Sequence, residues 1–221
     1  MIQIAPSILA ANYAALGEDV RKVGNADLLH VDIMDGHFVP NLSFGPDVTS
    51  AVNGVTEQFL DMHLMIEEPE RWFETYALAG GDRLVFHAEA VADPVAAAKR
   101  CRELGVQSGI AIKPATAVEP YLDHLEHFDE VLVMSVEPGF GGQKFMPEVL
   151  GKVMRLRDAI REQGTSTVIG IDGGIAEATI AQAAEAGVDA FVAGSAVFGA
   201  SNPAEAVERL RALAREAAGD Q

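Results

Sequence analysis

LLHVDIMDG, residues 28–36, is the stretch that decides the fold, because it sets a histidine and an aspartate two positions apart within an apolar run. Side chains two positions apart on a strand share a face. His30, Asp32 and Met34 therefore point one way, while Val31 and Ile33 point the other. The stretch predicts a strand that carries polar groups inward, toward a common interior.

Short β-rich runs of this kind alternate with longer helical stretches along the whole chain. The helical stretches carry apolar residues at three- and four-residue spacing, as at Val207, Leu210 and Leu213. The expected strands are residues 2–5, 28–33, 58–64, 83–86, 108–112, 130–134, 167–171 and 190–193. The expected helices are residues 11–23, 46–52, 69–79, 91–104, 118–124, 147–163, 176–186 and 203–217.

Eight strands, each followed by a helix, predict a single (β/α)8 barrel, a TIM barrel, that forms one domain over residues 1–221. The competing architecture is a doubly wound open sheet, which usually carries a glycine-rich fingerprint after its first strand. Here the first strand runs into Pro6-Ser7-Ile8-Leu9 instead. The barrel is therefore the favoured fold.

The composition narrows the classes of partner. The formal net charge of -17 argues against a nucleic-acid partner, because such binding uses a basic surface. The apolar runs are too short to cross a bilayer, and no basic segment or cleavage pattern marks the N-terminus. We therefore expect a cytoplasmic protein without a membrane partner. The single cysteine, Cys101, is expected to be a buried small apolar residue.

In a barrel, polar residues at the carboxyl ends of the strands converge on one face. The residues at these positions are Ser7, His30, Asp32, His63, His87, Glu89, Lys113, Ser135, Asp172 and Ser195. A lone inward histidine is usually a core residue, and a lone aspartate at a strand end is often a helix cap. Taken together, His30, Asp32, His63 and Asp172 favour a site for one divalent metal ion, namely Zn2+, Fe2+, Mn2+ or Co2+.

Two other groups of residues surround this set. Met34, Met65 and Met134 fall at strand ends on the same face, where they are either core filler or a water-excluding cap. Glycine-rich loops follow strands six to eight, and their backbone N–H groups favour binding of a phosphate. The loop residues concerned are Gly139, Phe140, Gly141, Gly142, Gly173, Gly174, Gly194 and Ser195.

A metal, two carboxylates and a phosphate anchor suit proton abstraction beside a carbonyl. Inversion of a stereocentre needs a proton removed from one face and another delivered to the opposite face. Asp32 and Asp172 come from separate parts of the strand ring, as two-sided proton transfer requires. We therefore assign the acid–base roles to these two aspartates.

At these residues the sequence resembles the ribulose-phosphate 3-epimerase family of the pentose phosphate pathway. The matching stretches are APSILA (5–10), HVDIMDGHFVPNLSFGP (30–46), MHLM (62–65), MSVEPGFGGQ (134–143), IDGGI (171–175) and VAGSAVF (192–198). The resemblance implies a barrel of the ribulose-phosphate-binding type that interconverts D-ribulose 5-phosphate and D-xylulose 5-phosphate. It also implies a homo-oligomer, either a dimer or a hexamer.

The resemblance implies roles for individual residues as well. Asp32 would accept the proton and Asp172 would donate it, with both aspartates and both histidines holding the metal. Ser7, His63 and Asp172 would touch the substrate along with the glycine-rich loops, and the three methionines match the family's cap. Gly170-Ile171 departs from the pattern, because a pair such as Glu-Val is expected before Asp172. The roles of His87, Glu89 and Lys113 are left open.

Three alternatives stay open at this point. One is a 3-epimerase acting on a hexulose phosphate such as allulose 6-phosphate. A second is a related barrel for decarboxylation or aldol chemistry, which predicts a lysine in the catalytic cluster. A third is a non-catalytic barrel that binds a metal and a sugar phosphate.

Overall fold

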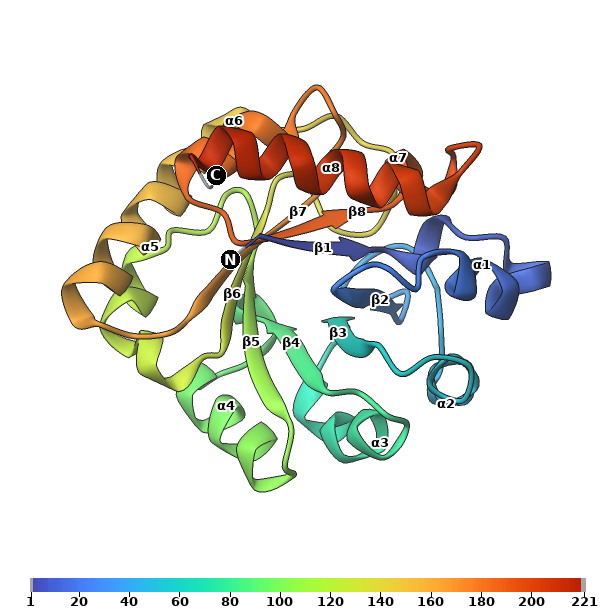
Figure 1. Cartoon of the computed structure of the whole chain (residues 1–221). Coiled ribbons are helices and arrows are strands. Elements are labelled where there is room, and N and C mark those ends of the chain that lie inside the picture. The colour runs from blue at the N-terminus through green and yellow to red at the C-terminus, as the bar shows by residue number, and fades with distance from the viewer. Residues whose placement is uncertain (1, 220–221) are drawn as a thin grey trace.

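Eight parallel strands form a single sheet, in a computed structural model that describes residues 2–219 (Figure 1). The strands run in the order β1-β8-β7-β6-β5-β4-β3-β2. Their bounds are β1 Gln3–Pro6, β2 Leu28–Met34, β3 Phe59–Met65, β4 Arg83–His87, β5 Gln107–Ile112, β6 Glu130–Met134, β7 Val168–Asp172 and β8 Ala190–Ala193. All eight strands lie where the sequence predicts them.

The sheet closes on itself between β1 and β2, so that it forms a barrel. Instead of a ladder, an isolated parallel bridge joins Ser7 to His30 at this seam. At the other end of the seam, the Ile4 N–H donates to the carboxylate of Asp27 at 2.8 Å. The Asp27 N–H in turn donates to the Ile4 carbonyl at 3.2 Å. The predicted (β/α)8 barrel is confirmed.

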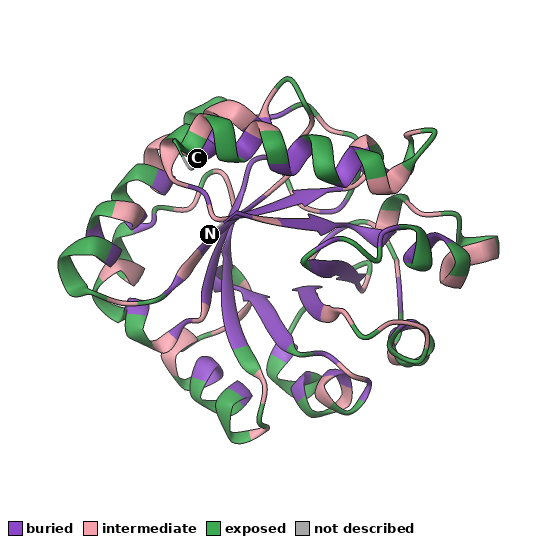
Figure 2. Cartoon of the chain, viewed as in Figure 1, coloured by how far each residue is buried: buried purple, intermediate pink, exposed green. Residues whose placement is uncertain are grey.

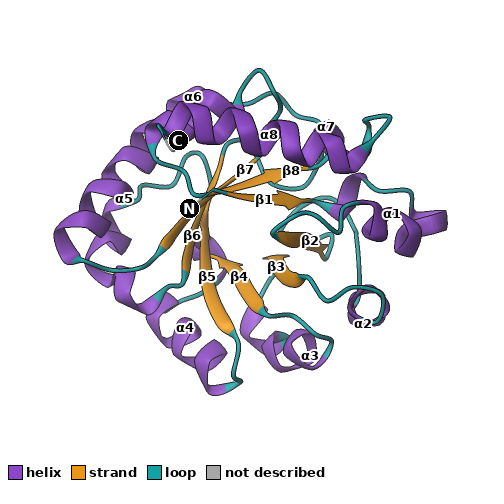
Figure 3. Ribbon diagram, in the orientation of Figure 1, coloured by secondary structure: helices purple, strands orange, loops and turns teal. Residues whose placement is uncertain are grey.

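The helices form a layer around the strands (Figure 3). The α-helices are α1 Leu16–Lys22, α2 Pro46–Asn53, α3 Phe73–Leu78, α4 Pro94–Glu103, α5 Leu150–Gln163, α6 Ile180–Ala186, α7 Ser195–Phe198 and α8 Pro203–Ala218. The 3-10 helices are η1 Ile8–Ala10, η2 Tyr13–Ala15, η3 Pro69–Arg71, η4 Ala88–Ala90, η5 Glu119–His127 and η6 Pro147–Val149.

Several helix boundaries differ from the expectation, and the helices expected at 11–23 and 69–79 begin only at Leu16 and Phe73. The helix expected at 118–124 is the 3-10 helix η5, and the one expected at 176–186 begins only at Ile180. Residues 176–179 form a turn instead, in which Thr179 Oγ1 accepts from the Ala176 N–H and donates to the Gly174 carbonyl. The short helix α7 was not expected, because four residues are too few to show a periodic pattern.

The strands are almost wholly buried, while the helices are buried only on their inner faces (Figure 2). On β2 the alternation follows the prediction. Leu29, Val31 and Ile33 join the large apolar core that also includes buried helix residues. Leu28 belongs to a separate apolar cluster inside the barrel. His30 and Asp32, which share its face, therefore point into the barrel.

A repeated aspartate fixes the amino ends of the strands. Before each even-numbered strand, a carboxylate accepts the backbone N–H of the second residue of the preceding strand. The four pairs, at 2.7–3.0 Å, are Asp27 with Ile4, Asp82 with Leu60, Asp129 with Ser108 and Asp189 with Ile169. These contacts secure the end of the barrel opposite the carboxyl ends of the strands.

Among the described residues, no helix is long and apolar enough to span a membrane.

Candidate metal and active site

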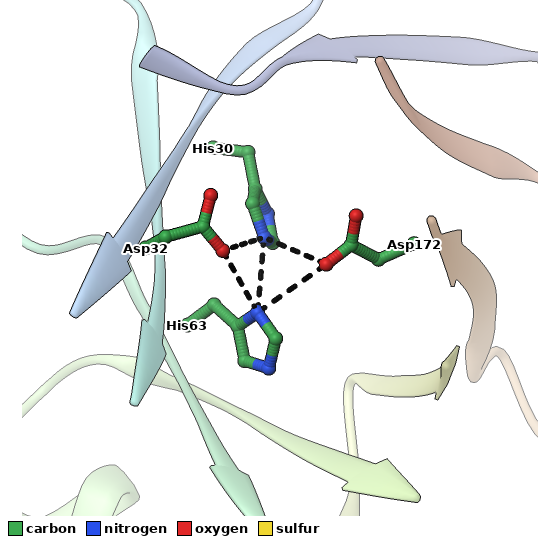
Figure 4. A group of neighbouring side chains, drawn as sticks. All are labelled: His30, Asp32, His63 and Asp172. Atoms are coloured by element: carbon green, nitrogen blue, oxygen red, sulfur yellow. Dashed lines mark hydrogen bonds and ion pairs between the residues drawn. The ribbon is translucent and has the colours of Figure 1, made fainter. Parts of the chain in front are cut away.

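Three strands bring the four predicted ligand residues to one point inside the barrel (Figure 4). His30 and Asp32 come from β2, His63 comes from β3 and Asp172 comes from the end of β7. Each residue offers one ligand atom, and these four atoms all lie within 4.8 Å of one another. The predicted convergence of these residues is therefore present in the structure.

The two imidazoles lie between the two carboxylates. His63 Nδ1 is 3.1 Å from Asp32 Oδ1 and 3.6 Å from Asp172 Oδ2. His30 Nε2 is 3.4 Å and 3.9 Å from the same two oxygens. The two ring nitrogens are 3.3 Å apart. Nitrogen and oxygen lone pairs from three strands thus face one small volume.

The surroundings of the two carboxylates shift their pKa values in opposite directions. Burial opposes ionisation of Asp32, but the effect of the adjacent His30 and His63 outweighs it and holds the pKa of Asp32 well below its usual value. Burial and the negative charge of Asp32 raise the pKa of Asp172 to about 6. Paired groups whose environments separate their pKa values are typical of acid–base sites.

The donor set fits a divalent cation. His30 and His63 are fully buried, and the side chain of Asp172 is only 17% exposed, so water does little to disperse the charge of the carboxylates. Although burial opposes protonation of His30, its contacts with Asp32 and Asp61 raise the pKa of its ring well above the usual value. The cluster therefore favours a positive charge at its centre, and imidazole with carboxylate suits Zn2+, Fe2+, Mn2+ or Co2+.

A chain of buried ionic groups supports His30 at Nδ1, the ring nitrogen that faces away from the cluster. The His30 Nδ1–H donates to Asp61 Oδ2 at 2.8 Å, and Asp61 Oδ1 accepts from Arg83 Nε at 2.7 Å. Arg83 Nη2 in turn lies 3.1 Å from Glu130 Oε2. A histidine that gives one ring N–H to a carboxylate has a fixed tautomer, which leaves its other nitrogen free to bind a metal. Here that free nitrogen is Nε2, which faces the cluster.

Sequence reasoning missed Asp61, Arg83 and Glu130. Each one lies near the start of a strand, whereas the geometry of a barrel draws attention to the strand ends. A usable signal existed for Asp61, which precedes His63 by two residues and so shares its inward face. Burial, which Arg83 only partly offsets, raises the pKa of Glu130 to about 7.

His87 and Glu89, whose roles the sequence left open, support the second histidine, His63. His63 Nε2 lies 2.9 Å from His87 Nε2, and His87 Nδ1 lies 3.2 Å from Glu89 Oε2. Burial lowers the pKa of His87 to about 4, because the effect of burial outweighs that of the hydrogen bond to Glu89. Lys113 does not point into the cluster, because its ammonium group lies 3.9 Å from the centre of the Phe38 ring.

Two serines hold the aspartates, one at its carboxylate and the other at its backbone. The Ser7 hydroxyl donates to Asp32 Oδ2 at 2.5 Å, so that Oδ1 is left to face the histidines. The Ser135 hydroxyl donates to the carbonyls of Asp172 and Gly173 at 2.9 and 2.7 Å. Ser7 therefore orients the Asp32 side chain, and Ser135 fixes the backbone that carries Asp172.

A cavity of about 540 Å3 opens above the cluster. It is within the usual size range for a small-molecule site. Among the predicted residues, those lining it are Ser7, Asp32, Met34, Met65, Met134, Gly139, Phe140, Gly141, Gly142, Asp172, Gly173, Gly174, Gly194 and Ser195. His30 and His63 do not line it, because both are buried beneath the carboxylates.

The methionines divide into two groups. Met34 and Met65 pack with Val39 in a small apolar cluster, whereas Met134 packs in the cluster inside the barrel. All three are nearly fully buried and all three line the cavity. They therefore provide an apolar wall beside the charged cluster.

Backbone conformation and close packing also require glycine at positions beside the cavity. Gly173 and Gly174 adopt φ values of +120° and +64°, which favour glycine. A Cβ on Gly174 would lie 2.5 Å from the Phe145 backbone nitrogen. The loop after β7 therefore packs directly against the loop after β6. Across the cavity, the Asn41 amide donates to the Gly139 carbonyl at 2.9 Å, a contact that the sequence did not indicate.

Comparisons with known proteins agree with this geometry. A model of the Ribulose-phosphate 3 epimerase family matches residues 3–198. The ribulose-phosphate 3-epimerase of Mycobacterium tuberculosis strain H37Rv is 56% identical over 208 residues, which are 94% of this chain and 91% of that protein. The ribulose-phosphate 3-epimerase of Bacillus subtilis strain 168 is 44% identical over 214 residues, 96% of this chain and 99% of that protein.

A solved structure supports the fold alone. KGPDC from Streptococcus mutans superposes with a TM-score of 0.73 at 14% identity, over 98% of this chain and 98% of that one. Its low identity limits the likeness to the barrel itself. By the family match and the identities of its relatives, the chain belongs to the ribulose-phosphate 3-epimerase family.

Proposed function

We propose that the protein interconverts D-ribulose 5-phosphate and D-xylulose 5-phosphate by epimerisation at C3. One observation carries the proposal. Asp32 and Asp172 enter the cluster from β2 and from β7, with the two histidines between them (Figure 4). A substrate carbon held above the histidines would have one carboxylate on either side, as inversion requires.

Two proton transfers follow from this arrangement. The Asp32 carboxylate takes the C3 proton, and the electron pair of the C–H bond moves toward the neighbouring carbonyl to give an ene-diolate. The Asp172 carboxyl then delivers a proton to the opposite face of C3. In the reverse direction the two aspartates exchange roles. Ser7, bonded to Asp32 Oδ2, keeps the Asp32 carboxylate aimed during both transfers.

His30, Asp32, His63 and Asp172 would hold one divalent metal ion. When bound, such an ion supplies Lewis-acid stabilisation of the negative charge that develops on oxygen. The chain's own contribution is the buried and apolar surroundings in which this charge forms. Met34, Met65 and Met134 exclude water from one side of the cavity, which strengthens electrostatic interactions inside it.

The glycine-lined end of the cavity supports phosphate binding. Gly173, Gly174, Gly194 and Ser195 line the cavity together with residues 139–142, so main-chain groups of the loops after β6, β7 and β8 would border a bound phosphate. In many barrels the loops after strands seven and eight bind phosphate. Phosphate bound at this end would place the sugar carbons toward the two aspartates.

The pentulose is the finer part of the proposal, because a hexulose phosphate offers the same reacting carbon and the same phosphate. We would compare kcat/KM for D-ribulose 5-phosphate and D-allulose 6-phosphate with one preparation. The expected result is a clear preference for the pentulose phosphate. A preference for the hexulose phosphate would contradict the proposed substrate but not the two-carboxylate chemistry.

Three further expectations belong to the proposal. Elemental analysis of the purified protein would identify the native metal among Zn2+, Fe2+, Mn2+ and Co2+. Light scattering coupled to gel filtration would show whether the protein is a homo-oligomer. We also propose a cytoplasmic location, which cell fractionation would check.

A further inference from the structure

The two histidines of the cluster present different ring nitrogens to it. His30 faces it with Nε2, which leaves Nδ1 to donate to Asp61. His63 faces it with Nδ1, which leaves Nε2 directed toward His87 at the end of β4. No carboxylate of the described residues contacts this buried Nε2 directly. Instead, its hydrogen-bond partner is Nε2 of His87, at 2.9 Å.

Two imidazole nitrogens that share one hydrogen bond need one proton between them. The other ring nitrogen of His87, Nδ1, lies 3.2 Å from Glu89 Oε2. An ionised carboxylate can only accept, so the proton of this second contact belongs to His87 Nδ1. A neutral His87 then has a bare Nε2, which accepts the proton of His63 Nε2. His63 is left with a bare Nδ1 toward Asp32 and Asp172.

We propose that His87 and Glu89 are positioning residues, which hold His63 in the tautomer whose bare Nδ1 faces the cluster. The relay runs from Glu89 in η4 through His87 at the end of β4 to His63 on β3. His63 and His87 are fully buried, so water cannot replace the hydrogen bond between them, whereas the Glu89 side chain is 22% exposed. The inference rests on the proposed function only in taking the cluster as a metal site.

The surroundings of the relay favour this arrangement. The rings of His63 and His87 have centroids 5.1 Å apart. The Phe38 ring lies 4.8 Å from the His87 ring, and the Lys113 ammonium group lies on Phe38. Glu89 is the carboxylate that contacts His87 directly. A histidine bound to a metal usually gives its other N–H to such an outer partner, and loss of that partner costs about 10- to 100-fold in metal affinity.

Glu89 also has a purely structural task, from which its role in the relay must be separated. Its Oε1 accepts the backbone N–H of Lys113 at 2.9 Å and the hydroxyl of Thr116, and so ties η4 to the segment after β5. Thr116→Val removes one of these ties but leaves the contact between Glu89 and His87. It is the matched control. Glu89→Ala removes both tasks, and Glu89→Gln keeps one acceptor oxygen, which can face either His87 or the Lys113 N–H.

The first measurement reads the tautomer itself. In protein labelled with 15N and loaded with Zn2+, long-range 1H–15N correlations show which ring nitrogens of His63 and His87 carry protons. We expect a proton on His63 Nε2 and on His87 Nδ1 in the wild type and in Thr116→Val. A proton on His63 Nδ1, or on His87 Nε2, in the wild type would overturn the inference, whatever the variants do.

The second measurement is the affinity for Zn2+ alone, by competition with a chromophoric chelator and without sugar phosphate. Glu89→Ala is expected to bind Zn2+ about 10- to 100-fold more weakly. Glu89→Gln should bind Zn2+ with an affinity between those of Glu89→Ala and the wild type, because its single acceptor oxygen serves only one of the two donors. Thr116→Val should match the wild type. Wild-type affinity in Glu89→Ala, or an equal loss in Thr116→Val, would contradict a positioning role. Because neither readout uses catalysis, absence of epimerase activity would count against the proposed function but not against the relay.

Discussion

Asp32 and Asp172 reach the same nitrogen, His63 Nδ1, at 3.1 and 3.6 Å, although their strands lie three positions apart around the barrel. Each aspartate is fixed by a different serine, Ser7 at the Asp32 carboxylate and Ser135 at the backbone of Asp172. The barrel therefore places two independently anchored carboxylates around one pair of imidazoles. This relationship is the basis of the proposed two-sided proton transfer that inversion at a carbon needs.

The hydrogen bond from Ser7 to Asp32 should matter for the rate. Ser7→Ala leaves Asp32 Oδ2, which is 2.5 Å from the hydroxyl in the wild type, without this donor. Hydrogen bonds to charged groups contribute about 1.5–3 kcal/mol, so we expect kcat/KM to fall by roughly 10- to 100-fold. Steady-state kinetics on D-ribulose 5-phosphate would measure the change. A value within twofold of the wild type would show that Ser7 does not orient Asp32.

Removal of the metal should abolish activity reversibly. Without a cation, two buried carboxylates lie close together with only the histidines to offset their charge. We expect chelated protein to lose epimerase activity and to regain it when a divalent ion is added back. Its melting temperature should also fall on chelation, because a ligand that binds only the folded state stabilises it. Full activity in protein shown by elemental analysis to lack metal would contradict the metal site.

Gly170 and Glu130 should be coupled in stability. A Cβ on Gly170 would lie 3.0 Å from Glu130 Cδ and 2.9 Å from Leu132 Cδ1, so the Glu130 side chain occupies the space beside this glycine. Gly170→Ala should lower the free energy of unfolding by about 1–3 kcal/mol, as overpacking does. In a Glu130→Ala background the same change should cost less by at least about 0.5 kcal/mol, the lower scale of coupling between residues in contact.

Gly151→Ala is the control for this pair. Gly151 lies in α5, and a Cβ there would meet nothing within 4 Å. Alanine at this position should leave the protein unchanged or stabilise it by up to about 1 kcal/mol. Urea unfolding of the four variants and the wild type would give all the values. Strict additivity of Gly170→Ala and Glu130→Ala would show that the two side chains do not compete for space.

Cys101 should not react in the folded protein. It is fully buried, and burial raises the pKa of its thiol to about 12 from the usual 9.0. The thiolate is the reactive form, so its population at pH 8 falls by about a thousandfold relative to an ordinary thiol. A thiol reagent should label the protein only on unfolding, in urea. Rapid stoichiometric labelling of the native protein at pH 8 would contradict this environment.

The strands were predictable because their alternation is strong and local. The bounds of β6 and β8 match the expectation to the residue, and the inward face of His30 and Asp32 follows from their spacing on β2. The helix expected at 118–124 is a 3-10 helix, because a pattern over seven residues cannot separate a period of 3.0 from one of 3.6. The sequence therefore predicts the strands and site ligands more accurately than the type and start of short helices.

The ligand set was also predictable, whereas its support was not. Strand ends in a barrel meet by geometry, so polar residues there can be grouped from the sequence alone. Asp61, Arg83 and Glu130 lie one layer deeper, where contact depends on which side chains reach across the barrel interior. His87 and Glu89 stand at a strand end in the sequence, but their partner could be identified only from the distances.

The most direct test of two-sided proton transfer is exchange at C3 in deuterated water. The metal-loaded wild type should epimerise D-ribulose 5-phosphate and place solvent deuterium at C3 of D-xylulose 5-phosphate. Asp32→Asn and Asp172→Asn should each lose at least about 100-fold in epimerisation, the lower scale of acid–base catalysis. Undiminished epimerisation in either variant, or an epimerised product that carries no deuterium at C3, would contradict the two-carboxylate mechanism.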